Sequence, residues 1–197
     1  MDMSDTVAGD TPQHIVMRFA DSMCGGVDTI GEHRKVIAEQ GAVWIAKLGK
    51  PLAGQKISLL GEQINRGTPT YLFLVRRKGA AYEWVKARLV ALNRRLPQKE
   101  ACLTPSYYRP AGVMENAGTW LKVTKLMKPE PGEIAKLHVS SSGRQIIDTL
   151  KGSMAAMFLV TFGRSAHSSQ LTSKEIKQSF EDAVLDVFEE DEDQDHW

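Results

Sequence analysis

The stretch at residues 70–75 constrains the fold of this chain more than any other. It reads Thr-Tyr-Leu-Phe-Leu-Val, a nearly continuous apolar run rich in residues that favour β-strands. A strand made from such a run has no polar face to lie against water, so it must be covered on both sides. We therefore expect a central strand of a sheet with other elements packed on both of its faces.

Signals for strands and helices alternate on either side of this run. Apolar spacings of three and four predict helices over residues 29–40 and 52–66, and a shorter helix ends at residue 150. Strand patterns occupy residues 14–20, 42–48, 82–92, 119–126, 137–139 and 154–162. This order predicts an α+β fold, in which a bent mixed sheet of β-barrel type is flanked by helices and closed by its last strand.

Two stretches between these elements lack a regular pattern. Residues 76–79 read Arg-Arg-Lys-Gly and are expected to form a basic turn between two strands. Residues 93–118 form a connection that is long for a compact domain, and long connections are often functional.

Composition divides the chain into a folded body and polar ends. Residues 1–13 are acidic and are expected to be disordered, whereas residues 14–162 hold the expected domain. A Ser-rich linker follows at 163–171. A capping-box pattern then predicts a C-terminal amphipathic helix over 172–188, and an acidic tail follows at 189–197.

Charge is distributed unevenly along the chain, although the formal net charge is only +1. Residues 14–164 contain 23 Lys and Arg against 11 Asp and Glu, whereas residues 165–197 contain ten acids and two lysines. A body with about twice as many basic as acidic residues has the electrostatic signature of a polyanion binder. We expect the polyanion to be nucleic acid, and the alternative is a basic surface that serves only solubility.

No motif in the sequence supports a catalytic or metal centre. There is no glycine-rich phosphate loop, and no Ser-His-Asp arrangement stands out. Glu62, Glu83 and Glu100 have acid–base chemistry but no evident partner. The five histidines show no ligand spacing, and two cysteines are too few for a disulfide framework. We therefore expect a binding protein rather than an enzyme, with no catalytic residue, metal or cofactor.

The same composition predicts a compartment. Few cysteines are typical of proteins in reducing compartments, and no apolar run approaches the roughly 20 residues needed to cross a bilayer. The acidic, polar N-terminus differs from a secretory signal. We expect a cytoplasmic protein that makes no membrane contact.

Aromatic residues beside basic ones give a second indication of nucleic-acid binding. Trp44 lies in an expected strand near Lys47 and Lys50, and similar pairs recur as far as residue 122. Aromatic rings stack on bases, while lysine and arginine neutralise phosphates. Trp44 can instead be a core residue next to surface lysines, so both interpretations stay open at this point.

Four segments of the chain resemble the PUA-like superfamily, which includes EVE, YTH and ASCH domains. They are His-Ile-Val-Met-Arg-Phe at 14–19, Val-Trp-Ile-Ala-Lys-Leu-Gly at 43–49, Tyr-Leu-Phe-Leu-Val at 71–75 and the stretch 150–160. The resemblance extends over residues 14–162 and implies a bent β-barrel flanked by helices. EVE and YTH domains bind a modified base that is flipped into an aromatic cage. The resemblance therefore implies an EVE-like reader of a modified base, with DNA favoured.

This resemblance also implies a set of binding residues. The base-binding cage is assigned to Trp44, Trp84, Trp120, Tyr107 and Tyr108. Contacts with the base edge are assigned to Ser22, Ser140, Ser141 and Ser142. Contacts with phosphates are assigned to Lys47, Lys50, Arg76, Arg77, Lys78, Arg109 and Arg144.

Three other functions are compatible with the same sequence. The domain can be an RNA-binding module of the same fold, or an ASCH-like nuclease or hydrolase. It can also be an adaptor whose acidic C-terminal helix recruits a protein partner, such as a component of a restriction or modification system.

Overall fold

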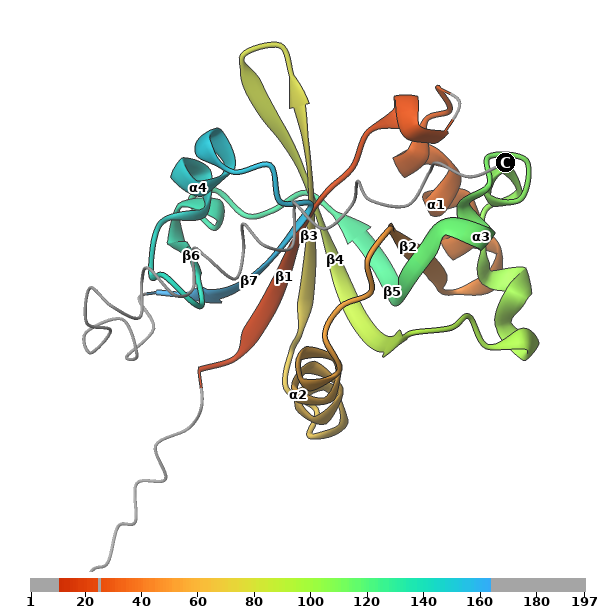
Figure 1. Ribbon diagram of the computed structural model, residues 1–197, viewed down its shortest axis with the longest axis horizontal. Coiled ribbons are helices and arrows are strands. Elements are labelled where there is room, and N and C mark those ends of the chain that lie inside the picture. Colours follow the sequence, from red (N-terminus) through yellow and green to blue (C-terminus); the bar gives the residue numbers. More distant parts are fainter. Residues whose placement is uncertain (1–10, 25, 164–197) are drawn as a thin grey trace, which may run out of the picture.

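The computed structural model describes residues 11–24 and 26–163, which form a seven-stranded mixed sheet with flanking helices (Figure 1). The strands are β1 (Gln13–Arg18), β2 (Val43–Leu48), β3 (Tyr71–Lys78), β4 (Ala81–Asn93), β5 (Ala117–Met127), β6 (Leu137–Val139) and β7 (Met157–Phe162). Their order across the sheet is β2-β5-β4-β3-β1-β7-β6. Strands β1 and β3 pair in parallel, and the other neighbours in this sheet are antiparallel. The predicted α+β fold with a bent mixed sheet is therefore confirmed.

The sheet is open, and the expectation that the last strand closes it is wrong. Strand β7 pairs with β1 on one side and with β6 on the other, so it lies inside the sheet. The short β6 forms one edge and β2 forms the other. Closure depends on pairing between the edges, which no local pattern in the sequence reports.

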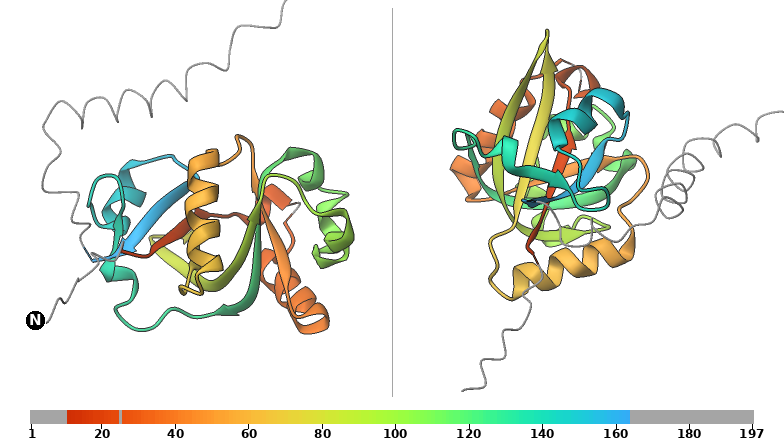
Figure 2. Two further views of the ribbon diagram at one scale, coloured as in Figure 1. Left: turned by 90° about the horizontal axis from the view of Figure 1, so that it is seen from below. Right: turned by 90° about the vertical axis from the view of Figure 1, so that its left-hand side faces the viewer.

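Three of the helices begin and end where local signals predicted them to within a few residues: α1 (Thr29–Gln40), α2 (Gly54–Asn65) and α4 (Ile146–Gly152). The short α3 (Val113–Asn116) was not predicted. The carboxylate of Asp28 caps α1 by accepting from the Gly31 amide at 3.0 Å, and Gly41 ends it in the left-handed conformation. Helix α2 lies across one face of the sheet (Figure 2).

The long connection at 93–118 contains more structure than its sequence indicated. It carries the short 3-10 helices η2 (Gln98–Leu103) and η3 (Ser106–Tyr108), and then α3. Two further 3-10 helices, η1 (Asp21–Cys24) and η4 (Ile134–Lys136), follow β1 and precede β6. Residues 164–171 of the expected linker, the C-terminal helix and the acidic tail lie outside the described residues, as do residues 1–10 of the expected N-terminal segment.

The side chains of β3 alternate between two hydrophobic clusters on opposite faces of the sheet. Leu72 and Leu74 belong to a central cluster, whereas Phe73 and Val75 belong to a second one, called here the α4 cluster. The central cluster is built around Leu60, Leu72, Leu74, Leu89 and Leu121, and the α4 cluster around Phe73, Val75, Ile146, Leu150 and Val160. The expected central strand, covered on both faces, is therefore present.

A third cluster, called here the aromatic cluster, consists of Trp44, Tyr107, Tyr108, Val113 and Trp120. It covers the face of β2 and β5 that points away from the central cluster, because Val43 and Ile45 of the same strand belong to the central cluster. Both faces of β2 are thus buried, although this strand lies at the edge of the sheet.

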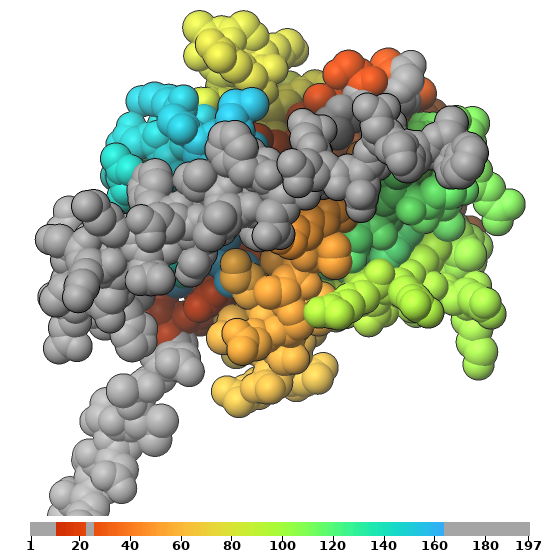
Figure 3. All heavy atoms as spheres, in the orientation of Figure 1, coloured from red at the N-terminus to blue at the C-terminus, as the bar shows by residue number. Residues whose placement is uncertain are grey.

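The expected basic turn at 76–79 is instead part of a long hairpin. Arg76, Arg77 and Lys78 continue β3 and pair with β4, where Arg76 lies opposite Glu83. Gly79 takes a positive φ of 63° at the turn. The tip of this β3–β4 hairpin, yellow in Figure 3, projects beyond the rest of the body. The pairing of the two strands overrides the local turn signal.

The start of β5 touches the chain after β2 so closely that residue 118 must be a glycine. A Cβ atom at Gly118 would lie 2.0 Å from the carbonyl oxygen of Gly49 and 2.8 Å from the nitrogen of Pro51. Both atoms belong to the main chain, so they cannot rotate away as a side chain can. We expect Gly118→Ala to lower the free energy of unfolding by at least about 2 kcal/mol, measured by urea denaturation.

The matched control is Gly61→Ala in the middle of α2, where an added Cβ meets no atom within 4 Å. Alanine stabilises a helix more than glycine does, so the free energy of unfolding of this variant should rise by about 0.5–1 kcal/mol. Equal stability of the two variants would contradict the close approach at Gly118.

Candidate functional site

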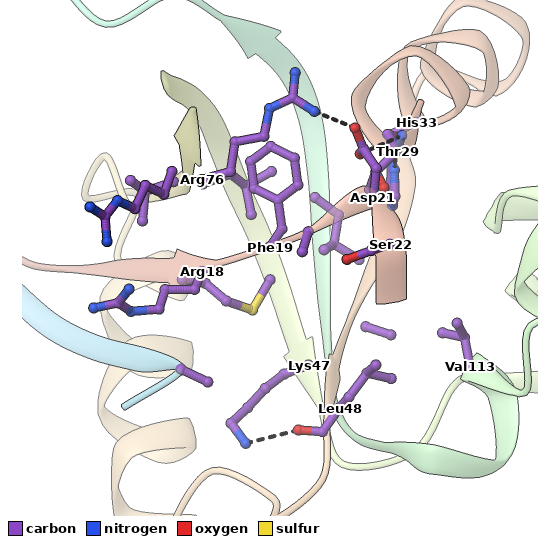
Figure 4. Close-up of a pocket in the computed structure, with 18 of the residues that line it drawn as sticks. Arg18, Phe19, Asp21, Ser22, Thr29, His33, Lys47, Leu48, Arg76 and Val113 are labelled. Atoms are coloured by element: carbon purple, nitrogen blue, oxygen red, sulfur yellow. Dashed lines mark hydrogen bonds and ion pairs between the residues drawn. The ribbon is translucent and has the colours of Figure 1, made fainter. Parts of the chain in front are cut away.

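A pocket of about 780 Å³ opens at one end of the strands, between the end of β1, the start of α1, the second half of β2 and the β3–β4 hairpin (Figure 4). Its walls are Met17–Ser22, Thr29, His33, Ile45–Leu48, Leu74–Lys78, Tyr82, Tyr107, Tyr108, Val113, Met154 and Ala156. Apolar and aromatic side chains make most of this surface, and charged side chains join them from the ends of the strands.

The position of the pocket follows from the parallel pairing of β1 and β3. The carboxyl ends of parallel strands lie on the same side of a sheet, so the chain leaves β1 beside the hairpin that extends β3. The Phe19 amide still donates to the Val75 carbonyl oxygen at 3.0 Å before the chain turns into η1. The pocket is the space between η1, this hairpin and β2.

A buried hydrogen-bond chain holds the wall formed by α1 and η3. The Nδ1 of His33 lies 2.6 Å from the Thr29 carbonyl oxygen, which can only accept, so Nδ1 carries the proton. Nε2 then accepts from the Tyr108 hydroxyl at 2.7 Å, and that hydroxyl accepts from the Ala46 amide at 3.2 Å. The chain joins α1, η3 and β2 through a neutral imidazole.

Burial keeps His33 neutral. Only 1% of its surface is exposed, and desolvation lowers its pKa to about 4, although the bond to Thr29 and the charge of Glu32 act in the opposite direction. Protonation would turn Nε2 into a donor and break its bond with Tyr108, so this wall depends on the neutral form.

Asp21 and Arg76 form an ion pair at one side of the mouth (Figure 4). The Arg76 guanidinium lies 5.3 Å from the centre of the Phe19 ring, and its Nε donates to Glu83 at 2.9 Å. Partial burial raises the pKa of Asp21, but the hydrogen bond from the Thr29 amide and the charge of Arg76 outweigh it and hold that pKa below its usual value. Asp21 is therefore an ionised acceptor at the mouth of the pocket.

The remaining basic groups at the mouth are arranged differently. Lys47 donates through Nζ to the carbonyl oxygens of Leu48, at 3.2 Å, and Lys50, and burial lowers its pKa. Arg77 and Lys78 lie on the projecting hairpin and are exposed. The site thus combines an apolar interior with positive charge around its opening.

The pocket brings together seven of the residues assigned from the sequence and leaves nine elsewhere. Those that line it are Ser22, Lys47, Arg76, Arg77, Lys78, Tyr107 and Tyr108. Those that do not are Trp44, Trp84, Trp120, Ser140, Ser141, Ser142, Lys50, Arg109 and Arg144.

The five aromatic residues assigned to a cage do not surround one space. Trp44 and Trp120 are in the aromatic cluster behind the pocket, whereas Trp84 packs against the α4 cluster. Trp44 is 1% exposed, and its Nε1 donates to Glu100 at 2.7 Å. Rings buried as far as those of Trp44, Trp120 and Tyr108 can stack on a base only if their cluster opens, and Trp84 is half-buried outside the pocket. The aromatic cage therefore stays a prediction.

Several residues of the site were not identified from the sequence. Arg18, Phe19, Thr29 and His33 line the pocket, but the first two lie at the end of β1 and the other two on α1, and no spacing links the two pairs. Asp21 was given no role from the sequence, and its pairing with Arg76 spans 55 positions of sequence. Such contacts leave no signal in a local pattern.

Within the part of the chain that the structure describes, no three His, Cys, Asp or Glu side chains are grouped so that they could hold a metal ion. No helix among the same residues has the length and apolar character needed to span a membrane.

The burial of Trp44 predicts the effect of removing it. Trp44→Ala should lower the free energy of unfolding by about 3–5 kcal/mol, because it empties the aromatic cluster and leaves Glu100 without one of its donors. Trp44→Phe keeps much of the apolar volume, so its free energy of unfolding should fall by less. Urea denaturation measures both, and a Trp44→Ala protein of unchanged stability that no longer binds oligonucleotides would place the ring in a ligand site instead.

The buried histidines predict a loss of stability in mild acid. The pKa values of His33 and His14 both fall to about 4, so between about pH 6.5 and 4 the unfolded chain binds protons that the folded chain does not. Stability therefore decreases as pH falls through this range, by about 2 kcal/mol per histidine between pH 7 and pH 5.

His33→Gln removes one of these two groups, so its stability should fall by less than that of the wild type between pH 7 and pH 5. The decrease that remains is the one due to His14. Denaturation curves at the two pH values give the comparison. A variant with the same pH dependence as the wild type would contradict the buried neutral imidazole.

Comparisons with known proteins place the chain in a family. A comparison with curated proteins and a comparison with solved structures each give no match. The family described as Pua-like matches residues 15–145, from β1 to the residue before α4, and this range is more than half of the chain. The match agrees with the bent mixed sheet and its flanking helices, and the chain belongs to the Pua-like family.

Proposed function

We propose that this domain binds nucleic acid and takes one base, a modified base of DNA, out of the helix and into the pocket. Pua-like domains generally bind nucleic acid, which gives the class of ligand. The observation that carries the proposal is the pocket itself, with its apolar interior and its basic mouth. Its volume of about 780 Å³ is that of small-molecule sites in proteins, so a base with an added substituent fits.

The interior of the pocket suits a base better than a phosphate. Phe19 and Tyr82 are half-buried and line it with rings, and the faces of bases pack on such surfaces. Asp21 is negatively charged and repels a phosphate, but it can accept from the amino or imino groups on the edge of a base. A carboxylate has about four acceptor sites, so its bonds with Thr29 and Arg76 leave acceptor capacity.

The outside of the pocket suits the phosphates that flank such a base. Arg77 and Lys78 are exposed on the projecting hairpin at the mouth. The folded body also carries the excess of basic residues that favours a polyanion through counterion release. Base inside and phosphates outside is the arrangement that base flipping requires, because the edge of a base is covered while it is stacked and paired.

A modified base in DNA is the most specific form of the proposal. The resemblance to EVE and YTH domains favours a modified base, and we favour DNA because EVE-like modules serve as reading heads of modification-dependent restriction systems. An RNA-binding module of the same fold is the alternative that the same experiment tests.

One variant that fills the pocket tests the proposal directly. Ser22 is exposed and lies on η1 at the pocket, so Ser22→Trp should block entry of a base without disturbing the core. Ser141→Trp is the matched control, because Ser141 is equally exposed but outside the pocket. We expect Ser22→Trp to bind at least about tenfold more weakly, and Ser141→Trp to bind as the wild type does.

Binding is measured by fluorescence anisotropy on short oligonucleotides. The panel holds duplex and single-stranded DNA, unmodified or with one 5-methylcytosine, 5-hydroxymethylcytosine or N6-methyladenine, and RNA of the same sequence. If the protein binds RNA most tightly, its ligand is RNA and not DNA. Loss of binding in Ser141→Trp but not in Ser22→Trp would move the site away from the pocket.

Hydrolysis of nucleic acid is a second candidate, favoured by one observation. Lys47 lines the pocket and burial lowers its pKa, and a lysine of lowered pKa can serve as a base. Incubating the same panel with the protein and with Lys47→Met separates the two functions. Cleavage by the wild type that Lys47→Met abolishes would support a nuclease, whereas binding without cleavage supports a reader.

A further inference from the structure

The loop between α4 and β7 ends in an apolar tip formed by Met154, Ala155 and Ala156. Met154 is 97% exposed, compared with 43% for Leu59, the next most exposed large apolar side chain of the described residues. Both alanines are also exposed, and Met154 and Ala156 lie at the pocket. Scattered exposed apolar residues are common, but this one is almost wholly in water and borders the candidate site.

Arg18 holds this loop in place. Its Nη2 donates to the carbonyl oxygens of Leu150 at 2.6 Å and Ser153 at 2.7 Å, and its Nε donates to that of Ala155 at 3.2 Å. The amide of Arg18 also donates to the Ala156 carbonyl oxygen at 2.8 Å. The last strand residue before the pocket thus fixes the loop by four bonds, so the apolar tip has little conformational freedom left to lose on binding.

We propose that Met154 is a wedge that enters the base stack of duplex DNA and fills the gap left by the base in the pocket. This inference rests on the proposed function. Removing a base from the stack exposes the faces of its neighbours, and apolar side chains such as Met inserted between base steps cover them. The thioether chain of Met is flexible and polarisable, so it packs well against aromatic faces.

The place of Met154 fits this role. The apolar tip and the basic residues Arg77 and Lys78 border the same pocket. When the hairpin holds the phosphates beside the mouth, the apolar tip lies against the strand from which the base has left. A charged or polar side chain at position 154 would be desolvated there without a partner, whereas Met carries no such penalty.

The proposal predicts a loss of binding that depends on the presence of a duplex. Met154→Ala removes the wedge, so it should bind the best duplex of the modified-base panel about tenfold more weakly. The isolated strand with the same base has no stack to open, so its affinity should fall by a clearly smaller factor. Leu59→Ala, on α2 and away from the pocket, is the matched control and should bind both probes as the wild type does.

A second variant tests the role of Arg18 as a positioning residue. Arg18→Lys keeps the positive charge but loses the fork of donors that holds the loop, so it should weaken duplex binding by a larger factor than single-strand binding. Melting temperatures show that each variant is folded. The fluorescence of 2-aminopurine next to the modified base reports stacking, and it should rise on binding more with Met154→Ala than with the wild type.

The outcomes separate the wedge from the proposed function. If Met154→Ala binds the duplex as tightly as the wild type, or loses the same factor on duplex and single strand, the wedge is overturned while base binding stands. If the wild type binds neither probe, the proposed function is overturned and the wedge with it.

Discussion

The parallel pairing of β1 with β3 is the contact on which the rest of this structure depends. A parallel pair cannot be joined by a tight turn, so the chain must cross over between the two strands. Here the crossover runs through α1, β2 and α2 and places β2 at the far edge of the sheet. The carboxyl ends of β1 and β3 then lie side by side, where η1 and the β3–β4 hairpin face each other across the pocket.

The positive charge of this domain serves two purposes that its composition does not distinguish. Arg18 holds a loop, Arg76 is paired with Asp21 and Glu83, and Lys86 forms a buried ion pair with Glu133. These groups satisfy buried or partly buried partners and stabilise the fold. The exposed Arg77 and Lys78 are the kind of side chain that can meet a phosphate at little cost. The basic excess therefore overstates the charge that is available to a ligand.

Elements with local causes could be predicted from the sequence. Helix α1 is specified by the Asp28 cap and by Gly41, and β3 by its continuous apolar run. The predicted turn at 76–79 is wrong because its residues gain hydrogen bonds along β4, which a local window does not include. The open sheet has the same origin, since the position of β7 is set by its pairing with β1, more than 130 residues earlier in the chain.

By itself, the sequence determined the alternation of strands and helices, the central position of β3, the basic character of the body and the resemblance that points to the Pua-like family. The tertiary structure alone decided which aromatic residues face a space and which are core. Tyr108 and Trp44 are both buried in the aromatic cluster, yet only Tyr108 reaches the wall of the pocket. Each contact depends on which elements the crossover brings together, and a ring packs equally well against protein or ligand until those neighbours are known.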